Sequence, residues 1–217
     1  IKDFIESNSK ISFSDFCEIA LQSAEALAHL HSKQVIHKDI NKNNILFDPD
    51  SKKITFIDFG ISTKLSRSVQ EYKNIGQLEG TLEYISPEQT GRMNRSIDYR
   101  TDFYSLGILL YELLSGKPPF QSNDPLEVIY SHIAVTPPSL ENVDAGLAKI
   151  INKLLEKNAE NRYQSAGGLL HDFKNLFELL AANKPTNDFA IGTKDHSGKF
   201  SIPQKLYGRD TEVAKLL

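Results

Sequence analysis

Apolar residues recur at helical spacing through most of the chain. Their period predicts a helix over residues 13–32 and shorter helices near 125–134, 145–157 and 165–182. Residues 100–115 are apolar almost all the way round the predicted helix, which is typical of a helix in the centre of a helical domain. These patterns predict a mainly helical fold with one central helix.

One stretch has the pattern of strands instead. Two short β-rich runs, Ile45–Phe47 and Ile54–Ile57, flank the turn-forming residues 48–51, which predicts a hairpin. Asn44 precedes the first run and Asp58 follows the second. Because the outer ends of an antiparallel pair lie side by side, we expect these two side chains to be neighbours.

The remaining stretches have no clear period. Residues 61–85 are polar and are predicted to form a long loop, which in a compact domain is usually functional or disordered. Residues 183–203 combine glycine and proline with polar residues, and they are predicted to be a linker. A structured pattern resumes over 204–217, so we expect the start of another domain there.

Composition narrows the class of protein. The 217 residues carry 25 Lys plus Arg and 28 Asp plus Glu, a net charge of −3, which argues against nucleic-acid binding by bulk charge. The single cysteine, Cys17, excludes an intramolecular disulfide. The most apolar run, Leu106–Leu114, is too short to span a bilayer and contains Glu112. We therefore expect a cytoplasmic protein segment without membrane contact.

Three side chains around the predicted hairpin form a candidate chemical site. Asn44 and Asp58 would present oxygen atoms to one point, and hard cations such as Mg²⁺ take few protein oxygens while keeping places for water and phosphate. Asp39 lies five residues before Asn44, where a carboxylate could accept a proton from a hydroxyl group. Two metal ligands and one base suffice for phosphoryl transfer from ATP.

Three motifs in order carry a family resemblance. His37-Lys38-Asp39 with Asn44 resembles the catalytic loop of protein kinases, Asp58-Phe59-Gly60 resembles their metal-binding motif, and Ser86-Pro87-Glu88 resembles the motif that ends their activation segment. The resemblance covers residues 1–182 and implies an α+β fold, namely the mainly helical large lobe of a Ser/Thr kinase. The small lobe, with the glycine-rich loop and strand lysine, is expected to be missing. The isolated piece is therefore expected to bind ATP poorly and to be inactive.

The resemblance also implies roles for single residues. Asp39 would be the catalytic base, and Asn44, Asp58 and Gly60 would bind ATP, with Asn44 and Asp58 holding Mg²⁺. Four structural roles are implied in addition: His37 within the catalytic loop, Thr81 bonding back to that loop, Asp102 holding its backbone, and Glu88 paired with Arg162.

The catalytic loop departs from the family pattern at two points. Asn41 stands where Ser/Thr kinases place a lysine that meets the transferred phosphate, and a carboxamide supplies no positive charge. Lys42 follows it and could either swing into the site or remain a solvated loop charge. Lys38 replaces an arginine that would pair a phosphorylated activation loop through a two-pronged fork.

A narrower resemblance concerns domain context. The stretches HKDIN, YISPEQTGRMNRSIDYRTDFYSLGILLYELLSGKPPF and RYQSAGGL are similar to the kinase-like domain of large bacterial sensor proteins. In those proteins an AAA-type ATPase, a GAF domain and a histidine kinase follow, and IPQKLYGRDTEVAKLL resembles the opening of that ATPase. The implied partners are a protein substrate and these attached domains. An alternative is a weakly active or inactive kinase-like module that regulates the attached ATPase and histidine kinase.

Overall fold

A computed structural model describes residues 1–2, 5, 11–64 and 81–196. The helices are α2 (Phe13–Ser32), α3 (Arg100–Ser115), α4 (Pro125–Ala134), α5 (Ala145–Leu154) and α6 (Ala166–Ala181). The strands are β1 (Val35–Ile36), β2 (Ile45–Asp48), β3 (Lys53–Phe56) and β4 (Thr63–Lys64), and short 3-10 turns η2 (Leu82–Tyr84), η3 (Pro87–Thr90) and η4 (Ala159–Asn161) complete the set. The predicted α+β class, mainly helical, is confirmed.

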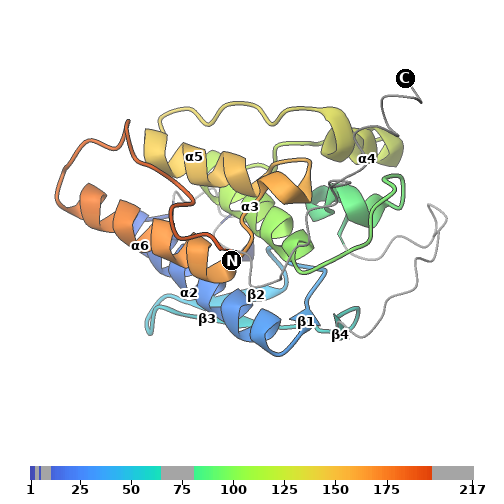
Figure 1. The fold of residues 1–217 in the computed structure, drawn as a ribbon, viewed down its shortest axis with the longest axis horizontal. Helices are drawn as coiled ribbons and strands as arrows, with labels where there is room; N and C mark the ends of the chain where they lie inside the picture. Colours follow the sequence, from blue (N-terminus) through green and yellow to red (C-terminus); the bar gives the residue numbers. More distant parts are fainter. Residues whose placement is uncertain (3–4, 6–10, 65–80, 197–217) are drawn as a thin grey trace, which may run out of the picture.

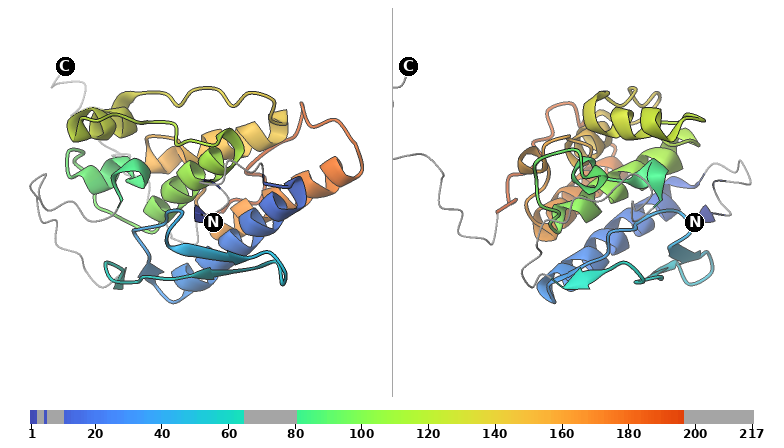
Figure 2. Two further views of the ribbon diagram at one scale, coloured as in Figure 1. Left: turned by 180° about the vertical axis from the view of Figure 1, so that it is seen from behind. Right: turned by 90° about the vertical axis from the view of Figure 1, so that its right-hand side faces the viewer.

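Helix α3 is the centre of the molecule and contacts α2 and α5, and α6 packs against both of those helices (Figure 1). Its residues from Thr101 to Leu113 are all buried, which explains why this helix is apolar on every side. Helices α2 and α6 lie side by side along much of their length, where Phe16 meets Phe177 edge to face. The core thus lies between these helices, and the strands lie at one edge of it (Figure 2).

The helix boundaries follow local hydrogen bonding. Ser12 caps α2 by accepting the amide of Asp15 at 3.0 Å, and Asp144 caps α5. The prediction that α5 extends to residue 157 is wrong, because the helix ends at Leu154. The carbonyls of Glu156 and Lys157 accept hydrogen bonds from the Arg162 guanidinium, at 2.7 and 3.1 Å, instead of continuing the helix.

The predicted hairpin is confirmed. Strands β2 and β3 are antiparallel, with Ile45 opposite Phe56 and Asp48 opposite Lys53. A second pair was not predicted: β1 pairs with β4, which lies at the start of the stretch that the sequence predicts as an irregular loop. Turn η2 lies near the other end of that stretch, and residues 65–80 lie outside the described part.

Residues 183–196 were predicted to belong to a linker, yet the structure fixes them against the domain. The carboxylate of Asp195 accepts the amides of Gln164 and Ser165 at 2.8 and 2.9 Å, at the start of α6. Gly168 leaves room for this contact, since a Cβ there would lie 2.6 Å from the Cα of Asp195. Thr186 donates its hydroxyl to the Asp144 carboxylate at 2.5 Å. These residues form part of the folded domain, and 197–217 lie outside the described residues.

Within the described residues, none of the helices combines the length and apolar character that a membrane crossing requires.

Helix α4 carries a buried histidine. His132 packs between the rings of Tyr104 and Phe120, with ring centroids 5.7 and 5.1 Å away, and its Nδ1 lies 3.0 Å from the Tyr104 hydroxyl. Burial, reinforced by the nearby charge of Lys157, lowers the pKa of His132 from 6.5 to about 3. The unfolded chain therefore binds a proton below pH 6.5 that the folded chain does not.

This difference predicts an acid-sensitive stability. Between pH 6.5 and 5.5, the free energy of unfolding should drop by about 1 kcal/mol from His132 alone, because the unfolded histidine is already half protonated at pH 6.5. Urea unfolding at pH 6.5 and 5.5 measures the effect, and the substitution His132→Gln should remove that part of it. His29→Gln, at an exposed position of α2, is the control. An unchanged pH dependence in His132→Gln would contradict the assignment.

Candidate active site

The loop between β1 and β2, residues 37–44, is anchored from inside the domain by Asp102. This carboxylate is fully buried near the start of α3. It accepts the backbone amides of His37 and Lys38 at 3.0 and 2.8 Å, and the Nε2 of His31 lies 2.9 Å from it. The expected role of Asp102 in holding this loop is thereby confirmed.

His37 joins the loop to the end of the hairpin. Its ring is buried, its Nε2 lies 3.2 Å from the carbonyl oxygen of Ile57, and its centroid is 4.7 Å from that of Phe59. The ring therefore contacts Ile57 and Phe59, the two residues that flank Asp58 in the chain. This is a structural position, because the described contacts of His37 are with backbone and packed rings.

The carboxylate of Asp39 is held in one orientation by three residues. Its Oδ1 accepts the amide and the hydroxyl of Thr81, at 2.9 and 3.0 Å, and the Nδ2 of Asn41 at 2.9 Å. Its Oδ2 accepts the Nδ2 of Asn44 at 2.9 Å. The expected bond from Thr81 back to the loop is confirmed. Asp39 is half-buried, so its carboxylate is held in place and is still reached by solvent.

Asn41 stands where the family pattern has a lysine, and its side chain makes hydrogen bonds to several residues of the site. Its Nδ2 lies 2.9 Å from the hydroxyl of Thr81, and its Oδ1 accepts the amides of Asn43 and Asn44 at 2.8 and 3.2 Å. The two backbone amides fix which end of the carboxamide is the oxygen. Asn41 thus ties Asp39, Thr81 and Asn44 together, but it brings no charge to the site.

The hairpin brings Asn44 and Asp58 together as predicted. The amide of Ile57 donates to the carbonyl of Asn44 at 2.9 Å, which places Asp58 one residue from that contact. Asn44 directs its Nδ2 toward Asp39, so its Oδ1, the predicted metal ligand, is not used in the bond to that carboxylate. Asp58 is exposed and has a φ of 60°, and its Oδ1 accepts the amide of Gly60 at 3.1 Å. A Cβ at Gly60 would lie 3.0 Å from that Oδ1.

This donor set fits Mg²⁺. An amide oxygen and an exposed carboxylate are hard ligands that leave room for water and phosphate oxygens. Within the described residues, no group of three or more His, Cys, Asp or Glu side chains could hold a metal ion.

The position of Lys42 agrees with neither of its two predicted roles, a group that swings into the site or a solvated loop charge. Its Nζ lies 3.0 Å from Oε1 of Glu112, which is buried in the last turns of α3. The amine is thus neither a solvated loop charge nor a group directed to Asp39. The structure brings Asp39, Asn41, Asn44 and Thr81 into one hydrogen-bonded cluster and leaves Lys42 outside it.

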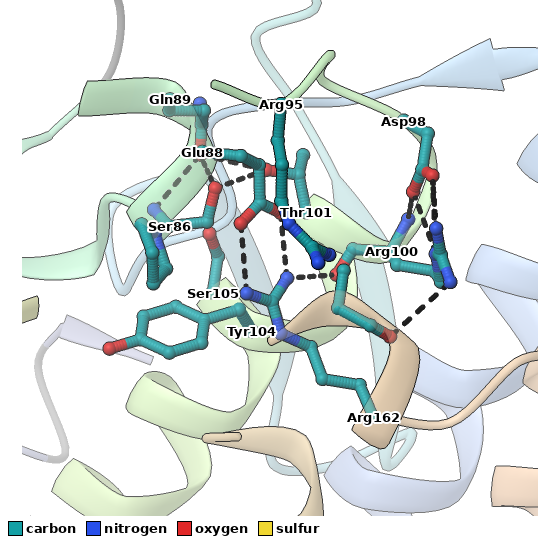
Figure 3. A network of polar contacts seen from close by, with 12 residues as sticks. Ser86, Glu88, Gln89, Arg95, Asp98, Arg100, Thr101, Tyr104, Ser105 and Arg162 are labelled. Atoms are coloured by element: carbon teal, nitrogen blue, oxygen red, sulfur yellow. Dashed lines mark hydrogen bonds and ion pairs between the residues drawn. The ribbon is translucent and has the colours of Figure 1, made fainter. Parts of the chain in front are cut away.

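Glu88 and Arg162 form the buried ion pair that was expected (Figure 3). The two guanidinium nitrogens lie 2.6 and 2.8 Å from the two carboxylate oxygens, and both side chains are buried. Beside them, Ser86 and Gln89 bond to each other, and Gln89 donates to the carbonyl of Lys38 at 2.8 Å. The pair therefore fixes η3, which in turn contacts loop 37–44.

Sequence reasoning missed three residues that support the site. Glu112 and Tyr84 bond to each other, and Gln89 contacts loop 37–44. Glu112 has a signal in the sequence, since a carboxylate within an all-round apolar helix needs a partner. Tyr84 and Gln89 have no comparable signal, because their partners are distant in sequence.

Comparison with known proteins agrees with this geometry. The profile of the protein kinase domain matches residues 1–174. A probable serine/threonine-protein kinase of Clostridium acetobutylicum is 38% identical over 181 residues, covering 81% of this chain and 27% of that protein. The serine/threonine-protein kinase PknB of Mycobacterium tuberculosis is 34% identical over 176 residues, covering 79% of this chain and 28% of its own length.

A third relative is named as a histidine kinase and not as a serine/threonine-protein kinase. The hybrid signal transduction histidine kinase G of Dictyostelium discoideum is 29% identical, over 95% of this chain and 9% of its own length. The chain thus spans less than a third of the length of each of these three relatives. With the match over residues 1–174 and the cluster around Asp39, the chain belongs to the protein kinase family.

Proposed function

We propose that this chain carries the phosphotransfer residues of a serine/threonine kinase that uses ATP and Mg²⁺. The observation that carries the proposal is the orientation of Asp39, whose carboxylate is held by Thr81, Asn41 and Asn44 while remaining half-buried. Such a group is positioned to accept a proton from a substrate hydroxyl. The serine/threonine kinases among its relatives support this class of substrate.

Each of these residues would have its own role in the reaction. Asp39 takes the proton of a serine or threonine hydroxyl as that oxygen bonds to the γ-phosphorus of ATP and the bond from this phosphorus to ADP breaks. Asn44 and Asp58 would hold Mg²⁺, which when bound neutralises phosphate charge. Thr81 and Asn41 keep the Asp39 carboxylate aimed, and His37 and Asp102 keep loop 37–44 on the domain.

The signalling context is part of the proposal. The relative named as a hybrid histidine kinase aligns with 95% of this chain, which supports a place in a larger signal-transduction protein. We infer that the chain lies in the cytoplasm beside ATPase and histidine kinase domains of the same polypeptide. Residues 204–217 would then begin the ATPase.

A regulatory module is the second candidate function. Asn41 is neutral and Lys42 is bound to Glu112, so neither supplies a positive charge to the transferred phosphate. A domain of this kind would bind nucleotide and control the attached domains without transferring phosphate.

One experiment separates the two functions. The full-length protein is incubated with Mg²⁺, γ-labelled ATP and a generic protein substrate, and nucleotide binding is measured in parallel. The kinase proposal expects label on serine or threonine and its loss when EDTA is added. Nucleotide binding without label would support the regulatory module, and the absence of both would contradict both functions.

A further inference from the structure

Lys42, Glu112 and Tyr84 form a hydrogen-bonded bridge centred on the buried carboxylate of Glu112. Oε1 of Glu112 accepts a hydrogen bond from Nζ of Lys42 at 3.0 Å, and Oε2 accepts the hydroxyl of Tyr84. The Glu112 side chain is only 1% exposed, whereas that of Lys42 is 26% exposed. The three residues come from loop 37–44, helix α3 and turn η2.

The buried carboxylate makes both partners necessary. A carboxylate removed from water is costly unless it is paired with a cation and its remaining oxygen is hydrogen-bonded. Lys42 supplies the cation and Tyr84 supplies the second hydrogen bond. Burial, and then the bond to Glu112, raise the pKa of Tyr84 above its ordinary value, so the phenol keeps its proton and remains a donor.

The bridge joins the same two segments that meet at Asp39. Thr81 begins the turn that contains Tyr84, and Thr81 bonds directly to Asp39. Lys42 lies three residues after Asp39 and two before Asn44. Segment 81–84 and loop 37–44 are therefore connected directly, where Thr81 bonds to Asp39 and Asn41, and also indirectly, through Glu112 of the central helix.

We propose that Lys42 is a positioning residue, which fixes the half of the loop that leads to Asn44 and couples it through Glu112 to segment 81–84. The proposal rests on the proposed function, because positioning is measured through phosphotransfer. Kinases of this family usually have a lysine that contacts the phosphate at position 41. The proposal explains how Lys42, one residue further along, can support catalysis without contacting the phosphate. Small displacements of positioned groups reduce rates steeply, so loss of the bridge acts on kcat rather than on nucleotide affinity.

The test compares four variants of the full-length protein: Lys42→Met, Lys42→Arg, Glu112→Gln and the Lys42→Met/Glu112→Gln double variant. We expect Lys42→Met to lower kcat about 10- to 100-fold with the KM for ATP nearly unchanged. Lys42→Arg, which keeps the charge, should restore most of kcat. The double variant should lose less than the product of the two single losses, since the two side chains act as a pair.

The control pair is Lys174 and Glu25, an exposed lysine and glutamate 3.5 Å apart between α6 and α2, each 53% exposed. Lys174→Met should leave kcat unchanged. An equal fall of kcat in Lys42→Met and Lys174→Met, no rescue by Lys42→Arg, or multiplicative losses in the double variant would overturn the proposal.

A second readout keeps the proposal testable if the wild-type protein transfers no phosphate. Amide hydrogen exchange reports local opening of backbone hydrogen bonds. In Lys42→Met, exchange should become faster both in residues 39–44 and in residues 81–84, and it should stay unchanged in Lys174→Met. Faster exchange in residues 39–44 alone would show that Lys42 acts only on its own loop, which would overturn the coupling.

Discussion

Arg162→Met is expected to lower the free energy of unfolding by about 3–5 kcal/mol, because it leaves the carboxylate of Glu88 buried without its cation. The Arg162 side chain is 0% exposed and that of Glu88 is 4% exposed. Arg162 also donates to the carbonyls of Arg100, Glu156 and Lys157, and its guanidinium lies 4.9 Å from the ring centroid of Tyr104. The substitution therefore removes both hydrogen bonds from the carboxylate of Glu88 (Figure 3) and one donor from each of three carbonyls.

Urea unfolding of the full-length protein and its variants measures this loss. Arg95→Met is the matched control, since Arg95 contacts Glu160 at 3.7 Å near the surface, and such a pair contributes about 1 kcal/mol or less. The double variant Glu88→Gln/Arg162→Met should regain part of the stability, because it removes the unpaired charge. A loss in Arg162→Met no larger than in Arg95→Met would contradict the anchoring role of the pair.

The sequence predicted the elements whose signals are local. Helices α2, α3, α4 and α6 follow apolar periodicity, and the hairpin follows two β-rich runs around a turn. The neighbourhood of Asn44 and Asp58 was predicted because antiparallel pairing alone brings hairpin ends together. Asp102, Thr81 and the Glu88–Arg162 pair were placed through family resemblance, and their contacts agree with it.

The features that the sequence did not predict depend on contacts between distant segments. The end of α5 is set by Arg162, and the segment before residue 196 is fixed by Asp195, whose contact needs the space left by Gly168. A polar stretch that is rich in glycine and proline has the same composition whether it is free or bound to a surface. Likewise, no local pattern indicates that Lys42 turns to Glu112, 70 residues away in the chain.

Asp39→Asn is expected to produce the largest loss of activity. The substitution keeps the shape of the side chain but removes the group that accepts the hydroxyl proton, and general bases contribute about 100- to 10,000-fold to rates. The KM for ATP should change little, since the predicted nucleotide-binding groups, Asn44, Asp58 and Gly60, remain. Asp50→Asn, in the exposed turn of the hairpin, is the matched control and should leave kcat unchanged.

The role of Asp39 as the base of a phosphotransfer site can be tested by comparing two rates of transfer. The full-length wild-type protein and Asp39→Asn are each saturated with Mg²⁺ and γ-labelled ATP, and the rate of label transfer to serine or threonine is followed. We expect a rate at least about 100-fold lower in Asp39→Asn at equal nucleotide occupancy. Equal rates in the two proteins would contradict it.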